Sequence, residues 1–157
     1  MAEPRPAPLL FALAFASGGL LTLMVLFNGQ MAEASTPLFS SLAAHGLGTV
    51  AAVALITALV AAGRMDPGRI ARPAPVWAWT GGLSGAVTVM LTSVTVNSAL
   101  ALAGTLALGL LGQVVFGLAT DRFGLFGLPR RPADGRDLAA LVLILAGSAL
   151  IVFAPGT

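Results

Sequence analysis

The residues of this sequence that could do chemistry are neutral polar side chains spaced four apart inside long apolar segments. Ser41, His45 and Thr49 have this spacing, which places them on one face of a helix. His45 is the only histidine, and an unperturbed imidazole titrates at about pH 6.5. It could contact a solute or carry a proton, or it could be a neutral group hydrogen-bonded to a neighbouring helix. The residues alone leave both interpretations open.

A second four-residue repeat contains Thr105, Gly109, Gln113 and Gly117. Small residues let two helices approach closely, and an amide can hydrogen-bond across such a contact, so these residue types favour helix packing. The alternative is a cavity in which the Gln113 amide offers both donors and an acceptor to a ligand.

The apolar segment at about residues 76–96 repeats this pattern. Gly81 and Gly85 lie four residues apart, and Thr88 and Thr92 lie on an adjoining face. Threonine hydroxyls can bond back to the carbonyls of their own helix. Packing is therefore the simpler interpretation of this segment, and lining a cavity is the alternative.

The inventory of reactive groups excludes most enzymatic chemistry. The chain has no Cys and no Tyr, so a disulfide framework, a thiolate metal site and a cysteine nucleophile are impossible. It also has no paired carboxylates, no histidine-rich metal spacing and no Ser-His-Asp set. We expect neither an enzyme nor a bound metal or cofactor. The positive charge consists of eight arginines in short segments, without the basic stripe that nucleic-acid binding requires.

The composition indicates that these polar residues are carried by membrane-spanning helices. Of 157 residues, 57% are hydrophobic and 9% charged, against roughly 25% charged in soluble domains. A spanning helix needs about 20 mainly apolar residues. The sequence predicts an all-α integral membrane protein, one membrane domain over residues 1–157, with five spans at about residues 8–27, 38–62, 76–96, 98–120 and 138–154.

Two local signals set the expected ends of the first spans. Asn28 and Gln30 close the first apolar segment, and their amides are interpreted as capping groups at the helix end. The alternative is that they lie at the mouth of a cavity. Thr36 followed by Pro37 is typical of a helix start, because Thr can cap and Pro suits the first turn.

The arginines predict one fixed orientation. If five helices alternate, all eight arginines (Arg5, Arg64, Arg69, Arg72, Arg122, Arg130, Arg131 and Arg136) lie on one side of the membrane. Cytoplasmic loops are enriched in Lys and Arg, so we expect the N-terminus in the cytoplasm and the C-terminus outside. An oppositely oriented homologous chain could supply an inverted second copy. So uneven a charge distribution favours a heterodimer over a homodimer with dual topology.

One run of residues is distinctive. It begins with Gly112-Gln113, continues with Asp121-Arg122-Phe123-Gly124-Leu125-Phe126-Gly127 and ends with Pro129-Arg130-Arg131-Pro132. This run resembles the signature of the YdcZ-like family of half-size bacterial inner-membrane proteins in the drug/metabolite transporter superfamily. The resemblance implies a five-helix half-transporter completed by antiparallel pairing. The resemblance also favours the interpretation that Gln113 lines a cavity, and it suggests that Asp121 locks the loop from Phe123 to Phe126.

The expected function is therefore half of an antiparallel, alternating-access transporter for a small organic metabolite or drug-like solute. The residues expected to contact the solute are Gln113, His45, Thr88, Thr92 and Gly109. The residues expected to serve packing or the loop are Gly81, Gly85, Asp121, Phe123, Gly124, Phe126 and Gly127. The alternatives are a passive channel, a lipid-head-group flippase subunit, or a membrane subunit that only stabilises a partner.

Overall fold

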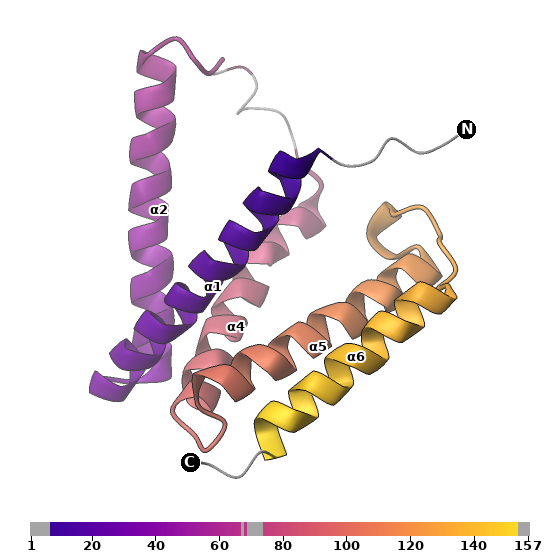
Figure 1. Ribbon diagram of the computed structural model, residues 1–157. Coiled ribbons are helices and arrows are strands. Elements are labelled where there is room, and N and C mark those ends of the chain that lie inside the picture. The colour runs from indigo at the N-terminus through magenta and orange to yellow at the C-terminus, as the bar shows by residue number, and fades with distance from the viewer. Residues whose placement is uncertain (1–6, 67, 69–73, 154–157) are drawn as a thin grey trace. The chain divides into compact units, whose positions relative to one another are not determined.

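The computed structural model describes residues 7–66, 68 and 74–153, and within these ranges it contains helices and no strands. Five helical segments in the described ranges are long and apolar enough to cross a membrane. They are α1 (Pro8–Ala34), α2 (Pro37–Ala61), the short 3-10 helix η1 (Val76–Thr80) continued by α4 (Gly81–Val96), α5 (Ala101–Phe123) and α6 (Gly135–Phe153) (Figure 1).

The chain divides into two compact units between Val94 and Thr95. The first unit holds α1, α2, η1 and most of α4, and the second holds α5, α6 and the short 3-10 helix η2 (Leu125–Gly127) between them. The single membrane domain over residues 1–157 stays a prediction. Arg5, Arg69, Arg72 and the expected last span residue, Ala154, lie outside the described residues.

Helix α1 is longer than the apolar segment that predicts it. It continues through Asn28 and Gln30 to Ala34, so these amides lie inside the helix and do not cap its end. At about 1.5 Å per residue, its 27 residues exceed the hydrocarbon thickness of about 30 Å.

Helix α2 begins where the sequence predicts. Thr36 is its N-cap, with Oγ1 accepting a hydrogen bond from the backbone N–H of Phe39 (3.1 Å), and Pro37 occupies the first turn. Adjacent serines then connect α2 to two other helices. Ser40 Oγ donates to the carbonyl of Asn28 in α1 (2.7 Å), and Ser41 Oγ donates to the carbonyl of Ala86 in α4 (3.0 Å). Both serines are buried, so they fix the positions of the three helices of the first unit.

In the second unit, α5 and α6 pack side by side and run in opposite directions (Figure 1). Ser148 Oγ donates to the carbonyl of Ala107 across this contact (3.1 Å). Gly104 lies at the same contact, where an added Cβ would lie 3.8 Å from Val152 Cγ2. Each unit therefore contains a buried serine hydroxyl that bonds to a carbonyl of a neighbouring helix.

The connection from α5 to α6 is a tight, hydrogen-bonded loop. Gly124, the residue directly after α5, lies in the left-handed region (φ 64°). The backbone N–H of Arg131 donates to the carbonyl of Asp121 (2.8 Å). Asp134 Oδ1 caps α6 by accepting from the N–H groups of Arg136 and Asp137 (2.8 and 2.9 Å). In return, Asp137 Oδ2 accepts from the N–H of Asp134 (3.1 Å), which completes a capping box.

Candidate solute-binding pocket

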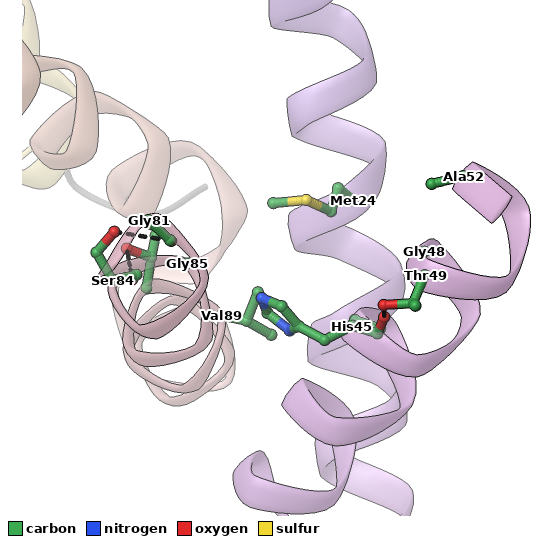
Figure 2. Close-up of a pocket in the computed structure, with 11 residues that line it drawn as sticks. Met24, His45, Gly48, Thr49, Ala52, Gly81, Ser84, Gly85 and Val89 are labelled. Carbon is green, nitrogen blue, oxygen red and sulfur yellow. Dashed lines mark hydrogen bonds between the residues drawn. The ribbon is translucent and has the colours of Figure 1, made fainter. Parts of the chain in front are cut away.

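A pocket of about 580 Å³ lies within the first unit between α1, α2 and α4 (Figure 2). This volume falls within the range of small-molecule sites, roughly 300 to 1,000 Å³. Helix α1 contributes one residue, and α2 and α4 contribute five each: Met24; Ala44, His45, Gly48, Thr49 and Ala52; Gly81, Ser84, Gly85, Thr88 and Val89.

His45 is the only ionisable residue that lines this pocket. Its ring extends from α2 towards α4 (Figure 2), and its Nδ1 lies 2.8 Å from the carbonyl oxygen of Ser41, one turn earlier in the same helix. A carbonyl oxygen only accepts hydrogen bonds, so Nδ1 must carry the proton and donate it. In the neutral ring, Nε2 then holds the free lone pair. No hydrogen bond to Nε2 is found within the described part of the chain.

Gly85 makes room for this ring. A Cβ at position 85 would lie 3.2 Å from Nε2 of His45, closer than side chains normally approach, whereas a Cβ at Gly81 would meet nothing within 4 Å. The two glycines therefore differ in role although both line the pocket. Gly85 permits the close approach of the imidazole to α4, and Gly81 leaves open space.

The hydroxyl groups of the pocket bond back to their own helices. Thr49 Oγ1 donates to the carbonyl of His45 (2.8 Å), Ser84 Oγ to that of Gly81 (2.9 Å) and Thr88 Oγ1 to that of Ser84 (2.8 Å). Thr92 Oγ1 donates to the carbonyl of Thr88 in the same way (2.9 Å). These are hydrogen bonds within single helices, α2 for Thr49 and α4 for the others. They leave each hydroxyl oxygen with only its lone pairs to offer to a ligand.

The pocket brings together five of the residues singled out from the sequence: His45, Thr49, Thr88, Gly81 and Gly85. Thr92 is absent from its lining. Gly109 and Gln113 are exposed residues of α5 in the second unit. Their contact with a solute stays a prediction, as it does for His45, Thr88 and Thr92.

Sequence reasoning missed the contributions of Met24 and of the small residues of α2. Ala44, Gly48 and Ala52 recur every four residues directly beside His45 and Thr49, so this series could have been read as one wall of a cavity. Met24 carried no comparable signal, because its place in the pocket depends on how α1 packs against α2.

The motif residues build the loop after α5. Asp121 contributes through its backbone carbonyl, which accepts from Arg131. Phe126 and Gly127 both have positive φ (57° and 80°), and the Phe126 ring packs against Phe116 of α5 with centroids 6.4 Å apart. Phe123 is exposed. These residues shape the chain reversal and belong to the second unit, whereas the pocket residues belong to the first.

An ion pair that the sequence did not reveal holds the end of this loop. The guanidinium of Arg131 donates to both carboxylate oxygens of Asp137 at 2.8 and 2.7 Å. The hydrogen bond and the charge of Asp137 raise the pKa of Arg131 above its ordinary value, with smaller contributions from Asp134 and Asp121. In the described ranges, no group of three His, Cys, Asp or Glu side chains could hold a metal ion.

A family model described as "Putative inner membrane exporter, YdcZ" matches residues 9–150, which cover most of both units and include the pocket and the loop after α5. No curated protein and no solved structure matches the chain significantly.

Proposed function

The chain belongs to the YdcZ family of inner-membrane proteins, and from this premise we propose that it is one half of an antiparallel dimer that transports a small organic solute by alternating access. The observation that carries the proposal is the pocket around His45, a space of about 580 Å³ between helices that are apolar enough to span a membrane. A pocket of this kind, with a few neutral polar groups, is the form that a solute site takes in a helical transporter.

The charge distribution supports an oppositely oriented partner. Five of the eight arginines lie in the described residues, at Arg64 after α2 and at Arg122, Arg130, Arg131 and Arg136 around the α5–α6 connection. In five alternating helices these positions face one compartment, which is the cytoplasm by the positive-inside rule. We therefore place the N-terminus inside and the C-terminus outside. The second half is a homologous chain with its cations on the opposite loops, in a heterodimer.

Within this assembly, His45 and Gln113 have distinct proposed roles. His45 contacts the solute in the pocket of the first unit, where Thr88 lies beside it. Gln113 orients the solute through its amide, and Gly109 leaves space one turn away on the same face of α5. Thr92 extends the polar face of α4 beyond the pocket.

The test is solute-driven exchange in liposomes that contain this chain together with a partner of opposite loop charge. A pH-sensitive dye inside the liposomes reports proton movement while a panel of small amines, phenols and hydroxylated aromatics is added outside. Saturable, solute-dependent proton movement supports a carrier. A linear, unsaturable flux indicates a channel, and the absence of flux in the reconstituted pair indicates an assembly subunit; either result contradicts the proposal.

A pair of glutamine variants tests the role of Gln113. Gln113→Leu should lower the affinity or the rate of the exchange, because the amide that we propose orients the solute is lost. Gln30→Leu makes the same chemical change at an exposed position of α1 and should leave exchange unchanged. Wild-type exchange in a normally assembled Gln113→Leu protein would exclude Gln113 from the site.

A further inference from the structure

The polar side chains of the pocket can accept hydrogen bonds but have no donor to offer. The Nδ1–H of His45 is bonded to Ser41, and the hydroxyls of Thr49, Ser84 and Thr88 are bonded to helix carbonyls. Nε2 of His45, the lone pairs of these three oxygens and the weakly accepting sulfur of Met24 remain. Nε2 is the strongest acceptor among them, because it is the basic nitrogen of an imidazole.

No charged group offsets this acceptor character. In the described residues of α1, α2 and α4, Glu33 is the only ionisable side chain besides His45. Glu33 is exposed near the end of α1 and does not line the pocket. α2 and α4 therefore present no charged or titratable group to the His45 ring, and α1 presents only Met24 to the pocket.

We propose that this pocket selects apolar solutes that carry a hydrogen-bond donor, a hydroxyl or an N–H group, which is donated to Nε2 of His45. We also propose that the hydrogen bond donated by such a solute and a proton exclude each other at this atom. This inference rests on the proposed function, since it names the solute class of the same site. It disfavours carboxylates, which find no side-chain donor in the pocket, and quaternary ammonium ions, which have no N–H to donate.

Mutual exclusion follows from the tautomer. With Nδ1–H held by the Ser41 carbonyl, a proton added to the ring must bind at Nε2 and turn the acceptor into a donor. An N–H donor of the solute would then face another donor, and a hydroxyl would have to turn and accept from Nε2–H instead of donating to it. A solute that donates to Nε2 of the protonated protein therefore releases one proton from Nε2 to water, and a proton that binds at Nε2 breaks the hydrogen bond that the solute donates. The exchange ratio is one proton per solute.

The single histidine makes this proposal directly measurable. Protein labelled with ¹⁵N-histidine in nanodiscs gives signals from one imidazole, whose nitrogen shifts identify the tautomer and its protonation. We expect the Nδ1–H tautomer in the neutral ring. An Nε2–H tautomer would overturn the proposal before any solute is added.

The solute probes are 4-tert-butylphenol and its methyl ether, which differ by one O–H donor. We expect the phenol to shift the Nε2 signal saturably and to bind about two- to tenfold more tightly than the ether, the factor that one net hydrogen bond gives. The advantage should vanish at pH values at which the ring is protonated. Equal affinities, or a preference for the phenol that persists in the protonated protein, would overturn the proposal.

Binding and transport can fail separately in this design. The nanodisc experiment requires no flux and no partner, so discrimination between the two probes supports the donor site even if the reconstituted pair shows no exchange, an outcome that would contradict only the proposed function. Saturable exchange without discrimination between the probes would overturn this inference and leave the proposed function standing.

Discussion

At the scale of single residues, the sequence left open a hydrogen bond from His45 to a neighbouring helix. In the structure Ser41 makes such a bond. The serine hydroxyl bonds to α4, whereas the imidazole bonds within α2. A four-residue spacing predicts that these residues share a face, but it cannot tell which of them reaches the next helix. Within the described residues, Nε2 of the ring consequently keeps its lone pair without a hydrogen bond.

We expect Ser41→Ala to destabilise the protein by about 0.6 to 1.5 kcal/mol, because a buried interhelical hydrogen bond is lost. The loss stays modest since the Ala86 carbonyl is part of helix α4. Ser17→Ala is the matched control: Ser17 is exposed, and its hydroxyl bonds to Ala14 in its own helix. Unfolding in mixed detergent micelles measures both variants, and equal losses would contradict the interhelical role.

A second residue-scale prediction separates the two pocket glycines. In Gly85→Ala, the new Cβ would lie 3.2 Å from Nε2 of His45, so the ring must shift and the ¹⁵N signal of Nε2 must change. Gly81→Ala adds the same methyl group where nothing lies within 4 Å, and the signal should stay in place. A similar response in both variants would show that the close contact at Gly85 does not position the ring.

Part of the site could be predicted from the sequence for a simple reason. Residues four apart in a helix share a face whatever surrounds it, so the alignment of His45 with Thr49 and of Gly81 with Gly85 follows from spacing alone. The meeting of α2 with α4, the contribution of Met24 and the tautomer of His45 depend on contacts between distant segments. Spacing within one helix carries no information about those contacts.

At the scale of elements, the end of α1 shows why polar residues predict a helix end poorly. Asn28 and Gln30 interrupt the apolar run, but neither side chain imposes a backbone conformation that would end a helix. The chain leaves the helix at Ser35 and Thr36 because the residue before proline is driven out of the helical region; Thr36 is extended (ψ 154°). The start of α2 was predictable because its signal, Thr-Pro, is a backbone constraint.

The loop after α5 gives an element-scale prediction with two matched glycines. Gly127→Ala places a side chain at φ 80° in open space, so it should cost about 1 to 2 kcal/mol, the penalty of the left-handed conformation. Gly124→Ala adds a clash to the same penalty, with its Cβ 2.7 Å from Arg130 Cγ and 3.1 Å from the Leu128 carbonyl oxygen.

Gly124→Ala should therefore be the more destabilising variant in the same unfolding assay. A smaller loss for Gly124→Ala than for Gly127→Ala would show that Arg130 does not pack against this glycine and that strain alone governs the loop.

At the scale of the whole molecule, the exposed surface is that of a membrane protein. Phe15 and Phe153 are 88% and 81% exposed, and the buried apolar residues of the described chain are only Val25, Ala32 and Val89. Apolar side chains in a bilayer gain little from packing inside the protein, because lipid is equally apolar. Small residues and serine–carbonyl bonds therefore hold the helices together. This surface offers ample area to lipid.

The last prediction concerns how the whole chain sits in the membrane. The protein has no cysteine, so single-cysteine variants need no altered background. In intact cells, Ser98→Cys, between α4 and α5, should react with a membrane-impermeant maleimide, while Ala133→Cys, before α6, should react only after the membrane is opened. We expect this result because arginines lie around the α5–α6 connection and cytoplasmic loops are enriched in Lys and Arg. A dual-topology homodimer would instead label about half of each variant, and it would remove the basis for a separate, oppositely oriented partner.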